Sequence, residues 1–75
     1  MDPDSAIFNI IKEMSSKVDG SMTPTVSLGD IRERIIAKGY TETQLDSCLR
    51  SYERDEIWVT NADNTLTWER ITGDE

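Results

Sequence analysis

A very short junction between two helices is the feature that most limits how this chain folds. Thr41-Glu42-Thr43-Gln44 has the S/T-x-x-E/Q pattern of a helix N-terminus. Just before it stands Gly39, and glycine readily takes the left-handed conformation that ends a helix. The stripe that precedes this glycine has helical spacing: Leu28, Ile31 and Ile35. We therefore expect two helices joined by a tight turn at Gly39-Tyr40.

Two more starting signals lie upstream of this junction. Asp4 or Ser5 is the expected N-cap of a first helix that ends at Asp19-Gly20. The apolar stripe of this helix consists of Ile7, Ile10, Ile11, Met14 and Val18. Thr25-Val26 follows a proline, which favours a short edge strand. Ser27, with Asp30 three residues later, matches a capping box for the second helix.

The hydrophobic period changes after the third helix, which we expect at about Thr41 to Glu56. The buried side of that helix is predicted at Leu45, Cys48, Leu49 and Tyr52. The segments 57–60 and 65–68 are rich in β-formers and flank the loop 61–64, which predicts a hairpin. If four loop residues connect directly opposed strands, Val59 faces Leu66 and Ile57 faces Trp68 on the core side. That register places Trp58 on the outer face, with Thr60, Thr65 and Thr67.

The order of these elements is helix, short strand, helix, tight turn, helix and hairpin. This is the order of a winged helix-turn-helix, an α+β fold with three helices, a short edge strand and a C-terminal β-hairpin. A chain of 75 residues is enough for one domain, so we expect a single winged-helix domain over residues 1–75 with an ordered core at about 5–71.

Charge and missing residue types exclude several classes of function. The chain carries 15 acidic and 8 basic residues, a net charge of −7, and no histidine. It has no phosphate-binding glycine pattern and no apolar run near the roughly 20 residues that a membrane helix needs. We expect no enzyme activity, no cofactor, no metal and no membrane partner. Cys48 is the one cysteine and is expected to be an inert core residue, and Asp63-Asn64 suit turn chemistry better than calcium binding.

One stretch also resembles a known family. It runs from the Gly39-Tyr40 turn through the Leu45, Cys48 and Tyr52 helix to Ile57-Trp58-Val59. It is similar to the C-terminal winged helix of the seventh subunit of the minichromosome maintenance (MCM) replicative DNA helicase, and the likeness is close over roughly residues 26 to 68. The tail after Trp68 is longer than in many relatives.

The resemblance implies that the chain is a fragment of a larger nuclear protein, an ATP-dependent DNA helicase subunit. ATP hydrolysis in that family belongs to a preceding domain whose motifs do not occur here. The implied role is protein–protein interaction in helicase loading and DNA replication. The implied partners are other MCM helicase subunits and origin-loading proteins.

The helix after the turn is the one that enters the major groove in DNA-binding winged helices. Its outward stripe is predicted at Thr43, Ser47, Arg50 and Arg54. Five acids against two arginines leave that helix at net −3, so we expect no autonomous binding to duplex DNA and a monomeric isolated domain. The alternative is a nucleic-acid-binding winged helix that acts only within the assembled complex.

Four residues are candidates for a partner surface: Tyr40, Arg50, Arg54 and Trp58. Each has a structural alternative. Trp58 also fits a core position over the end of the third helix, because a register shift of one residue turns its face. Tyr40 either extends an apolar patch with Phe8 and Ile36 or completes the core. Arg50 also fits a local pair with Asp46. Thr23-Pro24 is a minimal proline-directed phosphorylation site, and whether it is modified stays open.

Overall fold

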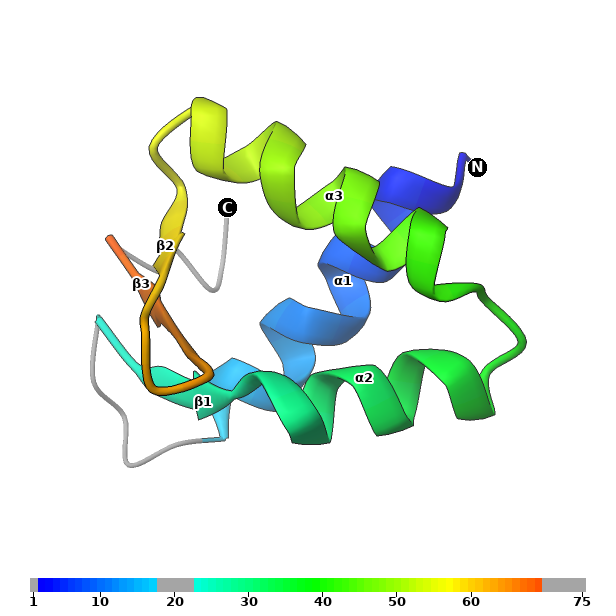
Figure 1. Cartoon of the computed structure of the whole chain (residues 1–75), viewed down its shortest axis with the longest axis horizontal. Coiled ribbons are helices and arrows are strands. Elements are labelled where there is room, and N and C mark those ends of the chain that lie inside the picture. The colour runs from blue at the N-terminus through cyan, green and yellow to red at the C-terminus, as the bar shows by residue number, and fades with distance from the viewer. Residues whose placement is uncertain (1, 18–22, 70–75) are drawn as a thin grey trace.

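The computed structural model describes residues 2–17 and 23–69 as three helices and a small antiparallel sheet (Figure 1). The elements are α1 (Pro3–Ser16), β1 (Thr25–Ser27), α2 (Leu28–Ala37), α3 (Glu42–Arg54), β2 (Trp58–Thr60) and β3 (Thr65–Trp68). The strand order is β1-β3-β2. Figure 1 shows the sheet at the end of α2 and α3 that is opposite to the turn joining them. The winged-helix prediction, with its edge strand and C-terminal hairpin, is confirmed.

The first helix begins earlier than the sequence analysis predicts. Its N-cap is Asp2 rather than Asp4 or Ser5, because the Asp2 carboxylate accepts a 2.8 Å hydrogen bond from the Ser5 backbone N–H. This bond lowers the pKa of Asp2. Pro3 takes the first helical position, where its missing N–H costs no hydrogen bond. Lys17 is the C-cap, and both Val18 of the predicted stripe and the predicted stop at Asp19-Gly20 lie outside the described residues.

The junction between α2 and α3 forms as predicted. Gly39 has a φ of +100°, a conformation that side-chain-bearing residues rarely adopt. The Thr41 hydroxyl accepts from the Gln44 N–H at 3.1 Å, and the Gln44 amide oxygen accepts from the Thr41 N–H at 2.9 Å. This two-way capping box starts α3 at once after the turn. Ser27 caps α2 by accepting from the Asp30 N–H at 3.2 Å.

The hairpin register differs from the prediction by one residue. The pairs are Trp58 with Trp68, Val59 with Thr67 and Thr60 with Leu66. The cause is the loop, because the Asn61 N–H donates to the Thr65 carbonyl at 2.8 Å, so that Asn61 still pairs and the connection begins only at Ala62. Asn64 then takes the left-handed conformation, with a φ of 66°, as asparagine tolerates. Three residues rather than four form the connection, so the inward face changes.

Trp58 is consequently a core residue, and the prediction that it lies on the outer face is wrong. Its side chain has 0% exposure, and its indole N–H donates to the Leu49 carbonyl at 3.1 Å. The Trp58 ring lies 5.0 Å from Trp68 in an edge-on arrangement and 5.6 Å from Phe8. Phe8 in turn stacks on Tyr52 at 4.4 Å. This aromatic cluster joins α1, α3 and both hairpin strands.

The core as a whole combines residues of the predicted helical stripes with residues of all three strands. Its buried apolar members are Ile7, Ile11, Val26, Ile31, Ile35, Leu45, Cys48, Trp58, Leu66 and Trp68. Ser15 is buried among them, and its hydroxyl accepts from the Trp68 indole at 2.7 Å and donates to the Ile11 carbonyl at 2.8 Å. The polar edge of each tryptophan therefore has a partner inside the fold. No helix within the described ranges has the length and hydropathy that crossing a bilayer requires.

Candidate functional site

The predicted outward stripe of α3 lies on the surface and forms one wall of an open groove. The groove has a volume of about 470 Å³ and is lined by Asp4, Thr43, Asp46, Ser47, Arg50, Ser51 and Arg54. All of these except Asp4 belong to α3, which starts at the Thr41 capping box and turns Leu45 and Cys48 to the core. Asp4 comes from the first turn of α1. The groove is thus built where two helices far apart in sequence meet.

Cys48 holds the start of α1 against α3. Its thiol donates to the Asp4 carbonyl at 3.4 Å. Burial, with smaller effects from the charges of Asp4 and Asp2, raises the pKa of Cys48 from an ordinary value of 9.0 to about 12. A thiol with this pKa carries almost no thiolate at neutral pH, so it lacks the reactive form of a nucleophile. Cys48 beneath the groove is a packing residue, as the sequence analysis predicts.

The two arginines of the groove are exposed, and their guanidinium groups make no ion pair with the described part of the chain. Within residues 2–17 and 23–69 neither Arg50 nor Arg54 makes an ion pair, so the predicted alternative of an Asp46–Arg50 pair is not found. The ion pair that the structure contains in these ranges joins Arg32 to Glu42 at 4.0 Å, and both side chains are exposed. A guanidinium group offers five N–H donors in a planar fork. The donors of Arg50 and Arg54 are therefore available to an external acceptor.

The electrostatics of the groove are balanced rather than basic. Asp4 and Asp46 line it together with Arg50 and Arg54, so two acids offset two arginines. Duplex DNA needs a continuous positive strip to displace its counterions. The groove therefore lacks the excess of positive charge with which a protein displaces counterions from duplex DNA.

The hairpin offers no positive wing beside this groove. No Lys or Arg occurs between Ile57 and Trp68. The Thr60 hydroxyl donates to the Glu53 carboxylate at 3.3 Å, and the Asn61 side-chain amide donates to the Thr67 hydroxyl at 2.9 Å. The Asp63 carboxylate accepts from the Thr65 hydroxyl at 2.6 Å, which confirms that this loop uses turn chemistry. Among the described residues no cluster of ligands for a metal ion is found.

The structure separates the remaining candidates. Trp58 is buried and cannot touch a partner directly, and Phe8 belongs to the aromatic cluster rather than to a patch with Tyr40. Tyr40 is half-buried after the turn, where its N–H donates to the Ile35 carbonyl at 3.2 Å. Ile36, with 43% exposure, is the one large exposed hydrophobic side chain in the described part of the chain. Tyr40, Arg50 and Arg54 stay predictions as partner contacts.

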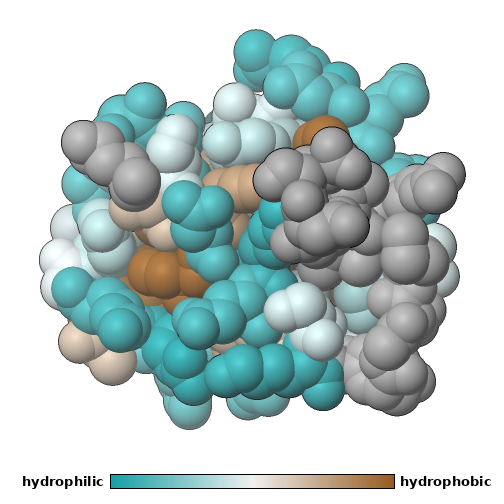
Figure 2. Space-filling model, turned by 180° about the vertical axis from the view of Figure 1, so that it is seen from behind, coloured by the Kyte–Doolittle hydropathy of each residue, from teal (hydrophilic) through white to brown (hydrophobic). Residues whose placement is uncertain are grey.

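Two further grooves were not predicted from the sequence. One has a volume of about 280 Å³, lies between α2, α3 and β2, and contains Leu28, Leu49 and the other side of Arg50. The second lies between α1 and α2 and is lined by Met14, Asp30, Glu33, Arg34 and Ala37. Neither has a sequence signature, because both depend on how neighbouring helices are placed. Figure 2 shows that the face behind the view of Figure 1 is mainly hydrophilic, with hydrophobic surface confined to small areas.

A comparison with known protein families gives a match that covers most of the chain. The family model described as "DNA replication licensing factor MCM7, winged helix" matches residues 5–68. The matched range extends from the first turn of α1 to the end of β3, so it also includes the first helix, which lies before the range 26–68 over which the resemblance is close. A search of curated proteins found no match.

Proposed function

Because the chain belongs to the winged-helix family of the DNA replication licensing factor MCM7, we propose that it is a docking domain through which such a factor contacts other replication proteins. The domain is a non-catalytic module with a role in DNA replication. The finer proposal is that its partners are other MCM helicase subunits and origin-loading proteins in the nucleus. Its parent protein is then a subunit of an ATP-dependent DNA helicase.

The observation that carries this proposal is the pair of arginines in the α3 groove. Arg50 and Arg54 are one helical turn apart, exposed, and without an ion pair in the described ranges. The hydroxyls of Ser47 and Ser51 line the same groove. Such a set suits hydrogen-bonding recognition of a few acceptor groups on a protein, because Arg is enriched among interface residues that contribute most of the binding energy.

The test is a titration of the ¹⁵N-labelled chain with individual MCM subunits and origin-loading proteins. We expect at least one of them to perturb α3 amides at tens of micromolar, and the double variant Arg50→Glu/Arg54→Glu to abolish the effect. Lys17→Glu/Lys38→Glu is the matched control, since it changes net charge equally at positions outside the groove. If no partner perturbs the domain, or if both double variants weaken binding equally, the proposed docking face is wrong.

A second candidate function is favoured by the position of the same arginines on the helix that follows the turn. In this alternative they contact nucleic acid, but only within the assembled complex. We expect the isolated domain to give no shift of duplex DNA at micromolar protein and physiological salt, where non-specific binders have Kd values of about 10⁻⁴–10⁻⁶ M. A salt-dependent Kd below about 10 µM would favour direct DNA binding instead. Within the whole assembly, loss of DNA association in Arg50→Glu/Arg54→Glu alone would support this second function.

A further inference from the structure

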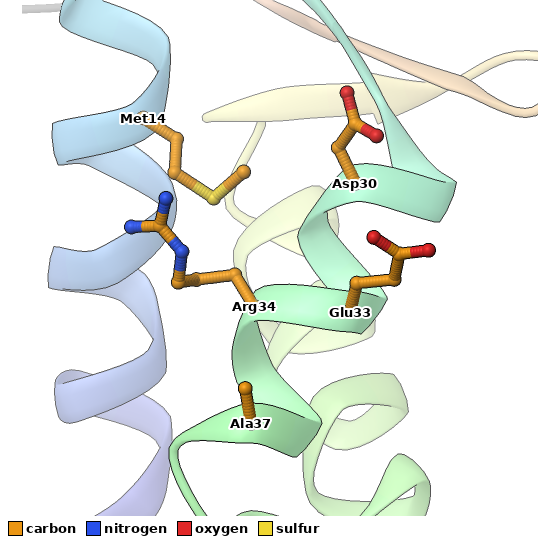
Figure 3. Close-up of a pocket in the computed structure, with 5 residues that line it drawn as sticks. All are labelled: Met14, Asp30, Glu33, Arg34 and Ala37. Carbon is orange, nitrogen blue, oxygen red and sulfur yellow. The ribbon is translucent and has the colours of Figure 1, made fainter.

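The groove between α1 and α2 is a second surface, separate from the outer face of α3. It has a volume of about 410 Å³, and its lining residues are drawn in Figure 3. Met14 comes from α1, and the others come from α2. The two helices present an apolar thioether, a methyl group and three charged side chains within a short distance. None of these residues belongs to the α3 groove.

The three charged side chains of this groove, Asp30, Glu33 and Arg34, do not pair with one another. Asp30 is four residues before Arg34, which is the spacing at which an acid and a base on a helix normally pair. Figure 3 shows that Arg34 instead extends from α2 toward α1, whereas the carboxylates of Asp30 and Glu33 point away from it. No ion pair of Arg34 is found in the described ranges. The guanidinium therefore lies in the groove beside Met14 and forms no ion pair with a carboxylate of the described residues.

Apolar surface lies next to this guanidinium. Ala37 and Met14 line the groove beside Arg34. Ala37 follows Arg34 by three residues, which corresponds to about 4.5 Å along the helix axis. A charged contact and an apolar contact are thus about one helical turn apart on the same side of α2.

We propose that this groove binds a protein segment in which a carboxylate stands three or four residues from a large apolar side chain. The carboxylate receives hydrogen bonds from Arg34, whose planar fork matches carboxylate geometry. The apolar side chain packs on Met14 and Ala37, and the flexible thioether of Met14 adapts to its shape. On a helix, side chains at this spacing are neighbours on one face, which matches the separation of the two contacts.

The two acidic side chains at the edge of the groove favour a protein segment over nucleic acid as the group that binds Arg34. Asp30 and Glu33 stand beside Arg34 on α2, so a run of phosphates that reached Arg34 would also meet two carboxylates. A single carboxylate on a peptide reaches Arg34 alone, and a lysine or arginine further along the segment pairs with Asp30 or Glu33. The proposal is independent of the α3 docking face, because it uses other residues.

The experiment uses the ¹⁵N-labelled 75-residue chain and a defined probe. The probe is a blocked 15-residue helical peptide of alanine and glutamine that carries one Glu and, four residues later, one Leu. A second peptide, with Gln in place of the Glu, is the control. At millimolar peptide we expect the amide signals of Met14, Arg34 and Ala37 to shift with the Glu peptide. We expect the Gln peptide to bind about fivefold more weakly, the effect of losing one exposed ion pair of about 1 kcal/mol.

Two variants separate this groove from the α3 face. Arg34→Gln should remove the preference for the Glu peptide, whereas Arg50→Gln, the same change in the other groove, should leave it intact. Equal affinity for both peptides, or loss of the preference in Arg50→Gln, would overturn the proposal. Shifts of the same amides that appear with rising chain concentration and no peptide would assign the groove to a second copy instead. Competition by duplex DNA at these amides would likewise refute a protein segment as the occupant.

Discussion

Replacing Trp58 by phenylalanine tests the corrected hairpin register directly. In the observed register Trp58 is fully buried against Phe8 and Trp68 and donates its indole N–H to the Leu49 carbonyl. In the register expected from a four-residue loop, the same side chain would lie on the outer face, and its replacement would cost little. The two registers therefore predict different free energies of unfolding for Trp58→Phe.

The expected loss is the sum of two terms. An indole buries roughly 50–100 Å² more than a phenyl ring, which corresponds to about 1–2.5 kcal/mol at 25 cal/mol per Å². The lost hydrogen bond to the Leu49 carbonyl adds about 1 kcal/mol. We expect Trp58→Phe to reduce the free energy of unfolding by about 2–3.5 kcal/mol. A domain of this size has roughly 4–11 kcal/mol in total, so the variant remains folded at low temperature.

Urea unfolding followed by far-ultraviolet circular dichroism measures this loss without relying on tryptophan fluorescence. With an m-value of about 1 kcal/mol/M, the midpoint should fall by roughly 2–3.5 M. Val59→Thr is the control, because it keeps the side-chain shape at a half-buried neighbour and should cost less than Trp58→Phe. A midpoint for Trp58→Phe within about 0.5 M of the wild type, or a larger loss for Val59→Thr, would refute the three-residue loop and the packing built on it.

Three further predictions concern local features. Gly39→Ala should lower the free energy of unfolding by about 1 kcal/mol or more, because the φ of +100° strains any side chain. Gly29→Ala in α2 is the control and should not destabilise the domain, since the added Cβ would lie an ordinary 3.4 Å from the Ser27 hydroxyl oxygen. Urea unfolding midpoints compare the two variants. Thr41→Ala removes the capping box of α3 and should lower the stability by about 1 kcal/mol, or the Tm by roughly 4–8 °C. Replacing the exposed Thr43 by alanine is the control and should not lower the Tm. Equal losses in the two variants would contradict the capping assignment. Cys48, with its pKa raised to about 12, should react with iodoacetamide at pH 8 much more slowly in the folded chain than in urea. Since the unfolded thiol ionises first, stability should also fall as pH rises from about 9 toward 12.

Much of the fold could be predicted because its signals are local. Gly39 and the Thr41–Gln44 box act over four or five residues, and each is satisfied by atoms of its own turn. Ser27 is a cap for the same reason. The N-cap of α1 was misplaced because three acceptor side chains, Asp2, Asp4 and Ser5, compete there. Asp2 is the N-cap because Pro3, the next residue, suits the first helical position.

The register of the hairpin could not be predicted in the same way. Trp58 and Val59 are both strand formers, so alternation along the strand fits either face. The decision depends on whether Asn64 belongs to a four-residue loop or takes the left-handed position of a three-residue loop. Asparagine tolerates both loop conformations, and the packing of two tryptophans and Leu66 in the core decides which of the two forms. That energy belongs to tertiary contacts that no local pattern contains.

The candidate surfaces show the same limit. The outward position of Arg50 and Arg54 follows from helical spacing alone, and the structure places both in one groove as the stripe predicts. The side of α2 toward which Arg34 extends does not follow from spacing. Asp30 at i−4 suggests a local pair, whereas in the structure the guanidinium extends toward α1. A groove between two helices depends on how the helices are placed relative to each other, and helical spacing along the sequence does not contain that placement.

The loop and the α3 surface are physically linked through Trp58. The left-handed Asn64 sets the register, the register turns Trp58 inward, and the Trp58 indole binds the carbonyl of Leu49, the residue before Arg50. Thr60, at the end of the same strand, donates to Glu53 on the next turn of α3. The hairpin is thus bonded to the second half of α3 at two points, the Leu49 carbonyl and the exposed Glu53 carboxylate. A shifted register would break both contacts and release the turns that carry Arg50 and Arg54, so the short loop preorganises the surface that we propose for docking.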